Sequence, residues 1–306
     1  MAIAQEITTS GALKGIAAVA SGVFIFTLVD AVAKWLGGAG YHPTQIVLMR
    51  HSFGLVPVAL AIWLSRGAGL RTTAPVAHLV RGLLMCGALL QFFWGLKYMP
   101  LAEAMAVAFT APLFITILSV LVLRETVGLH RWGAVAVGFI GMLIILRPGF
   151  GTFRPEALLI VSAALTFAFG VVFTRRMTAT ETNTAIFTYT TIVSILAIAP
   201  FGLATWQPPE NIHLGMFVIV GLLGGLAHFL VIVAYRHAPA AVNSPFEYTG
   251  LIWGSILGWI IWQEAPDLWV WVGAGIIVLA GLYITYREAV LARAVDGAMA
   301  RTLPPR

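Results

Sequence analysis

Glu247 is an acidic side chain placed well inside an apolar run of this 306-residue chain, seven residues past Ala240. On a helix this spacing places the carboxylate roughly 10 Å from the helix end, at about 1.5 Å per residue. An ionisable group at such a depth is costly and marks a candidate functional site. We expect Glu247 to bind a cationic group of a ligand or to carry a proton. The alternative is a structural acid paired with a neighbouring helix.

A second set of charged residues is expected near the opposite end of the apolar runs. Asp30 and Lys34 are four residues apart and therefore share a helix face, where they could neutralise each other. Arg50 is expected at a similar depth, and Glu103 at the outer end of the hairpin between the spans 78–98 and 101–123. These groups could form a gate whose ion pairs break and re-form, or a static network that fixes neighbouring helices.

Uncharged polar and aromatic residues complete the candidate binding site. His228 and Gln91 fall near the middle of their apolar runs, where they could form hydrogen bonds with a ligand. Tyr248, Trp94 and Phe169 could stack on an apolar or aromatic ligand. No second histidine, cysteine or carboxylate stands at ligand spacing from His228 or Gln91, so we expect no metal. We also expect no cofactor and no catalytic residues, since nucleotide-binding and nucleophile motifs are absent.

The elements that position these residues must be membrane-spanning helices. Hydrophobic residues make up 60% of the chain and charged residues only 10%, a composition typical of a protein in a lipid bilayer. A span needs about 20 apolar residues, so the sequence predicts an all-α protein of ten transmembrane helices. The predicted spans are 15–36, 43–63, 78–98, 101–123, 131–147, 156–175, 183–203, 213–235, 240–262 and 268–286.

The ten spans divide into two related halves. Shifting the segment 239–264 back by 139 positions aligns it without a gap on the segment 100–125, with six identities. The paired glutamates Glu125 and Glu264 close their helices, and we expect them to bind nearby cations or loop amides. We therefore predict one repeat over residues 1–150, a second over 151–290 and a basic tail over 291–306.

The distribution of charge predicts the topology. Most of the 18 lysines and arginines fall at the span ends that share a side with the N-terminus. The positive-inside rule then places both termini in the cytoplasm, and the net charge of +6 does not call for nucleic acid. Since each half contains five spans, the second half must be inverted relative to the first. Inverted repeats around a central cavity are the architecture of many secondary transporters.

The segment LKYMPLAEAMAVAFTAPLFITILSVLVLRETVGLHRWGAVAVGFIGMLII resembles the repeat of the drug/metabolite transporter superfamily, EamA branch. The resemblance covers essentially the whole chain, once per half. It implies five plus five inverted helices around a cavity lined by both halves. Leu251 replaces the proline found at Pro112 in the first half. We therefore expect the helix over 240–262 to be straighter than the helix over 101–123.

The sequence thus predicts a secondary transporter in a bacterial inner membrane rather than an enzyme. The resemblance and the aromatic, sparsely charged interior favour export of aromatic or other hydrophobic amino acids by alternating access, with proton coupling as an option. The alternative is an uptake carrier for a larger metabolite such as riboflavin or S-adenosylmethionine. A membrane-embedded enzyme and a passive channel are the remoter alternatives.

Overall fold

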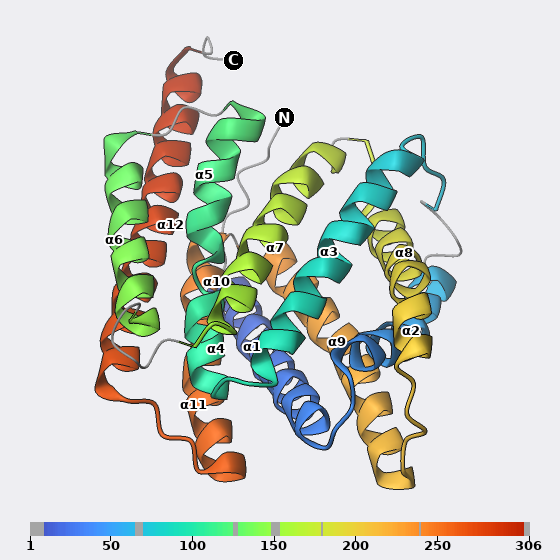
Figure 1. Cartoon of the computed structure of the whole chain (residues 1–306). Helices are drawn as coiled ribbons and strands as arrows, with labels where there is room; N and C mark the ends of the chain where they lie inside the picture. The colour runs from blue at the N-terminus through green and yellow to red at the C-terminus, as the bar shows by residue number, and fades with distance from the viewer. Residues whose placement is uncertain are drawn as a thin grey trace.

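The structure, a computed structural model, describes residues 9–64, 70–124, 128–147, 154–178, 180–238 and 240–302 (Figure 1). Within these ranges the regular secondary structure is helical throughout, with no strand. The first half contains α1 (Thr9–Gly38), α2 (Pro43–Leu64), α3 (Pro75–Leu96), α4 (Leu101–Ala108), α5 (Ala111–Leu123) and α6 (Leu129–Leu146). The second half contains α7 (Ala157–Met177), α8 (Asn183–Ala204), α9 (Asn211–His237), α10 (Ala240–Glu247), α11 (Thr249–Trp262) and α12 (Leu268–Thr302).

Each predicted span coincides with one helix or with a pair of consecutive helices. Among the described residues, eight segments are long and apolar enough to cross a membrane, and α4 with α5 counts as one of them. Neither α2 nor the broken pair α10 and α11 is among these eight. The chain is therefore an integral membrane protein. The tail predicted over 291–306 continues α12 as far as Thr302.

The helix breaks follow the internal repeat and correct one prediction. The helix over 240–262 was expected to be straighter than the helix over 101–123, but it is broken at Tyr248, the position that corresponds to the break at Phe109 in the first half. The Thr110 hydroxyl donates to the carbonyl of Val107 at 2.7 Å, and the Thr249 hydroxyl donates to that of Phe246 at 2.6 Å. These hydroxyls bind the carbonyls at both breaks, so the second break forms without the proline at position 251.

The ends of the two broken helices also correspond. Arg124 follows α5 with φ 57°, and Gln263 follows α11 with φ 58°. The two residues are 139 positions apart, the same interval that aligns the two sequence segments. A left-handed residue is a common way to end a helix, because it turns the chain away and leaves its N–H free for a carbonyl of the last turn. The repeat therefore extends from sequence to backbone conformation.

Corresponding helices of the two halves pack against each other in antiparallel orientation. Arg147, which follows α6, forms an ion pair with Asp267, which precedes α12. Farther along the same pair, Gly141 and Gly273 bring the two backbones together, since a Cβ on either glycine would lie under 3.0 Å from the other's carbonyl oxygen. Figure 1 shows α6 and α12 side by side along their length. The last helix of each half thus contacts its counterpart.

The second helices of the two halves, α2 and α8, form the same kind of contact. Gln45 near the start of α2 donates its amide to the carbonyl of Gln207 at 2.7 Å, and the Gln207 N–H donates back to the Gln45 side chain at 3.0 Å. The hydroxyls of Thr44 and Thr205 lie 2.7 Å apart. The beginning of α2 therefore meets the end of α8.

Candidate functional site

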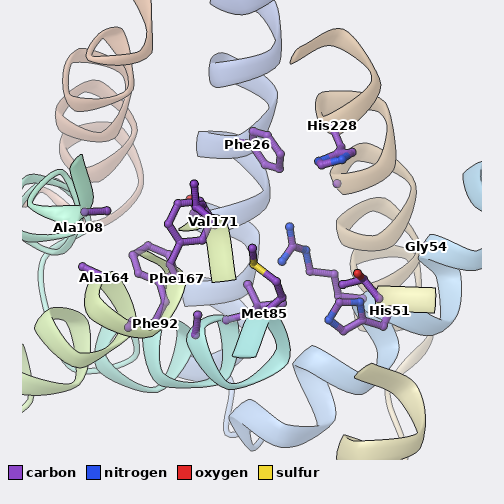
Figure 2. Close-up of a pocket in the computed structure, with 18 of the residues that line it drawn as sticks. Phe26, His51, Gly54, Met85, Phe92, Ala108, Ala164, Phe167, Val171 and His228 are labelled. Atoms are coloured by element: carbon purple, nitrogen blue, oxygen red, sulfur yellow. The ribbon is translucent and has the colours of Figure 1, made fainter. Parts of the chain in front are cut away.

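A cavity of about 660 Å³ lies between the two halves. Ligand pockets in proteins commonly measure about 300–1,000 Å³, so the cavity has room for an organic metabolite. Its lining comes from α1, α2, α3 and the region of the break between α4 and α5, and from α7, α8, α9 and α10. Figure 2 shows Phe92 and Phe167 on one side of the cavity and His51 and Gly54 on the other.

Most of the lining is apolar and aromatic. Five phenylalanines contribute, and they are Phe26, Phe92, Phe109, Phe167 and Phe187. Three glycines of α9 allow α2 to approach closely: a Cβ on Gly225 would meet Pro57 at 2.1 Å, and one on Gly221 would meet Phe53 at 2.3 Å. The third, Gly224, faces Arg50. The glycines therefore bring the polar residues of α2 to the cavity wall.

The cavity contains a small number of polar groups of both charges. Asp30 and Glu247 supply carboxylates and Arg50 supplies a guanidinium. Glu247 accepts a hydrogen bond from the Tyr235 hydroxyl. His228 stacks on Phe187, with ring centroids 4.8 Å apart and an interplanar angle of 7°. Four of the residues singled out from the sequence thus meet at one cavity: Asp30, Arg50, His228 and Glu247.

Other residues singled out from the sequence lie outside this lining. Gln91 accepts hydrogen bonds from Ser162 and Thr166 of α7 at 2.9 and 3.3 Å, so it joins α3 to α7. Trp94 contacts the ring of His42, with centroids 5.2 Å apart. Phe169 is 39% exposed on the outer surface of the bundle.

Tyr248 also lies outside the lining, although it follows Glu247 directly. Its ring packs on Phe109, with centroids 5.2 Å apart. Its hydroxyl occupies the space next to Gly281 of α12, where a Cβ would overlap it at 1.7 Å. Tyr248 therefore supports the break between α10 and α11 from behind the cavity wall.

The sequence interpretation missed Phe26, Met85 and Phe187 as parts of the cavity. A signal for Phe26 was present, since it precedes Asp30 by four residues and shares its helix face. Met85 and Phe187 lie in apolar runs without a nearby polar residue. Periodicity cannot separate such residues from those that face lipid.

Lys34 binds Glu264 and not Asp30, which corrects the expected pairing within α1. Its ammonium lies 2.6 Å from the Glu264 carboxylate and donates to the carbonyl of Met99 at 2.7 Å. The same carboxylate accepts the N–H of Leu101 at 3.1 Å. The expectation that Glu264 binds a cation and a loop amide is therefore confirmed, whereas Glu125 lies outside the described residues. This set, Lys34, Met99, Leu101 and Glu264, joins α1, α4 and α11 and is called the hairpin cluster below.

Glu103 lies near the hairpin cluster, in the first turn of α4. It forms no hydrogen bond or ion pair within the described ranges. The charges near its carboxylate are of both signs: Arg154 and Arg147, and the acids Asp267 and Glu264. Glu103 therefore lies near these charged residues without a direct bond to any of them among the described residues.

A second polar cluster lies at the opposite end of α3. The His78 ring nitrogen Nε2 lies 3.1 Å from the Glu181 carboxylate, which also accepts the Thr73 N–H at 3.2 Å. Arg81, one turn farther along α3, donates to Thr174 of α7 at 2.7 Å. The hydrogen bond from His78 is the main cause that lowers the pKa of Glu181. This cluster fastens the loop between α7 and α8 to α3.

The fold and the cavity define a polytopic membrane protein with a solute-sized site between two related halves. The model of the EamA-like transporter family matches residues 13–147 and again residues 154–287. The chain belongs to the EamA-like transporter family, within the drug/metabolite transporter superfamily that the sequence resembled.

Three relatives indicate what members of comparable similarity transport. The S-adenosylmethionine uptake transporter of Rickettsia prowazekii is 30% identical over 271 residues, which cover 87% of this chain and 92% of the relative. The riboflavin transporter of Vibrio cholerae is 31% identical and the alignment covers 86% and 90% of the two chains. The pseudopaline exporter CntI of Pseudomonas aeruginosa is 26% identical, with 84% and 90% covered. These names support the alternative substrate class and give no support to amino-acid export.

A protein of known crystal structure shares the fold. The two chains superpose with a TM-score of 0.62 at 20% identity, and the match covers 94% of this chain and 99% of the other. At this identity the likeness concerns the fold alone. It extends over nearly the whole of both chains.

Proposed function

We propose that the protein is an uptake carrier for a charged metabolite with an aromatic ring system, of the S-adenosylmethionine type. The observation that carries this proposal is the cavity, whose lining combines five phenylalanines with two carboxylates and one guanidinium. S-adenosylmethionine has an adenine ring, a sulfonium, an ammonium and a carboxylate. The aromatic surface suits the ring, and buried side chains of opposite sign suit the charged groups.

Riboflavin is the second candidate, favoured by the relatives from Vibrio cholerae and Rhizobium johnstonii. Its ring system would stack on the same phenylalanines. Riboflavin is uncharged at neutral pH, however, and would offer no charged group to Asp30, Arg50 or Glu247. Because unpaired charges are costly away from water, the lining favours a charged substrate.

The carrier mechanism proposed here is alternating access between two inverted repeats. The antiparallel packing of α6 on α12 and of α2 on α8 supports the inversion, since each pair consists of corresponding helices. The hairpin cluster would then be a closed gate, and the lining residues Phe187 and Thr190, near the start of α8, would lead to the opposite end. With both termini in the cytoplasm of a bacterial cell, the closed end faces outward.

The experiment is uptake into liposomes that contain the purified full-length protein. Labelled S-adenosylmethionine, riboflavin and tryptophan are compared, each with and without a proton gradient. We expect saturable uptake of S-adenosylmethionine that excess unlabelled riboflavin and tryptophan inhibit weakly. Uptake of riboflavin or tryptophan alone would contradict the proposal.

A further inference from the structure

Asp30 and Arg50 are the two charged groups of the cavity that lack a hydrogen-bonding partner among the described residues. Neither side chain forms a hydrogen bond or an ion pair with any residue that the structure describes. Their charges influence each other, but no nitrogen–oxygen pair between them lies within 4.0 Å. Lys34, by contrast, is bound by both Glu264 and a backbone carbonyl. Lys34, beside the cavity, is therefore fully bonded, whereas Asp30 and Arg50, in the cavity, have free hydrogen-bonding capacity.

Packing holds the guanidinium of Arg50 in place where hydrogen bonds do not. Its central carbon lies 5.6 Å from the centre of the Phe93 ring. The guanidinium also lies close to Gly224, where a Cβ would lie 3.2 Å from Nε and 3.5 Å from an Nη nitrogen. A fixed guanidinium with free donors is suited to bind a carboxylate through two parallel hydrogen bonds.

A third polar group adjoins this pair. The Nε2 atom of His51 is buried and has no hydrogen-bond partner among the described residues. Figure 2 shows the His51 ring at the cavity wall, on the same side as Gly54. Buried polar atoms are normally satisfied, and an exception indicates a missing partner. Three polar groups from adjoining parts of α1 and α2 are thus left for a ligand.

We propose that Arg50 and Asp30 bind the α-amino-acid head group of the substrate. Arg50 binds the carboxylate, Asp30 binds the ammonium, and His51 adds a hydrogen bond to the carboxylate. This assignment rests on the proposed function and makes it more specific, because the two residues then select zwitterions over neutral ring compounds. The competing explanation is that the two charges only neutralise each other across the cavity.

The test compares ligands that differ by one charged group, using binding to the purified full-length protein. Against S-adenosylmethionine, the decarboxylated analogue lacks the carboxylate and the 2-oxo analogue lacks the ammonium. A hydrogen bond to a charged group corresponds to about a 10- to 100-fold preference. We expect the wild type to prefer S-adenosylmethionine over both analogues by about this factor.

Substitutions then assign each preference to a residue. Arg50→Gln should abolish discrimination against the decarboxylated analogue and keep discrimination against the 2-oxo analogue, and Asp30→Asn should do the reverse. Gly224→Ala, which displaces the guanidinium without removing its charge, should weaken only the carboxylate preference. Arg236→Gln, an exposed arginine on α9, serves as the control and should behave as wild type.

Protein stability separates binding from mutual neutralisation. If Asp30 and Arg50 only neutralise each other, each single variant lowers the thermal midpoint, the double variant restores it, and the analogue preferences stay unchanged. This result would overturn the assignment and leave the proposed function standing. A wild-type protein that binds none of the three ligands would overturn both. If the variants lose their preferences at an unchanged or higher thermal midpoint, the assignment is supported.

Discussion

Glu264→Gln should destabilise the protein through the hairpin cluster. The substitution keeps the shape of the side chain but removes the charge that faces Lys34, whose side chain is 7% exposed. Breaking a fully buried ion pair costs about 3–5 kcal/mol. Because the Glu264 side chain is 26% exposed, water compensates part of this cost, and we expect about 2–3 kcal/mol.

The assay is thermal unfolding of the purified protein in detergent, followed as loss of the monodisperse peak. A loss of this size corresponds to a thermal midpoint lower by about 4–8 °C. The double variant Lys34→Met/Glu264→Gln removes both charges and should be no less stable than Glu264→Gln alone. Lys97→Met is the control, since Lys97 forms no ion pair within the described residues, and its effect should stay within about 0.5 kcal/mol. If the destabilisation of the double variant equalled the sum of the effects of Lys34→Met alone and Glu264→Gln alone, the reasoning would be refuted.

Two further predictions concern the packing between the halves and the second polar cluster. Gly273→Ala should lower the thermal midpoint by the equivalent of about 1–3 kcal/mol, because its Cβ would lie 2.6 Å from the carbonyl oxygen of Gly141. Gly275→Ala is the control and should be neutral or stabilising, since a Cβ there would have nothing within 4 Å. Equal effects of the two substitutions in thermal unfolding would contradict the antiparallel contact. The hydrogen bond from His78 holds the pKa of Glu181 below its ordinary value of 4.5. The ionised Glu181 therefore contributes its full share to protein stability at neutral pH, and this contribution is lost as the pH falls through the pKa of Glu181 in the folded protein. The thermal midpoint of the wild type should therefore fall more steeply between about pH 5 and pH 3 than that of Glu181→Gln, and parallel curves would contradict this role.

The helices and the repeat could be predicted from the sequence because both depend on regular local signals. Long apolar runs identify spans through the thickness of the bilayer. The shared pattern of 100–125 and 239–264 indicated related halves, and the equivalent breaks at Phe109 and Tyr248 agree with it. The second break itself was missed because the prediction relied on the proline at position 112, whereas the feature that both breaks share is a threonine hydroxyl that donates to a carbonyl three residues earlier.

The partners of the polar residues could be predicted only in part. Asp30 and Lys34 share a helix face, yet the partner of Lys34 is Glu264, which is 230 positions away in the chain. The spacing of residues along one helix cannot show which side chains of other helices lie next to them in the folded protein. Gln91 was grouped with His228 because both lie in mid-span, but its side chain faces Ser162 on a neighbouring helix. The direction in which a mid-span side chain points depends on helix packing, which the local pattern does not contain.

Counterflow tests the central claim most directly. Liposomes containing the protein are loaded with unlabelled S-adenosylmethionine and then exposed to a trace of the labelled compound outside. A carrier that exposes the cavity to alternate sides predicts a transient accumulation of label above its external concentration, saturable and absent from protein-free liposomes. Label that only equilibrates passively, or that does not enter at all, would contradict the account.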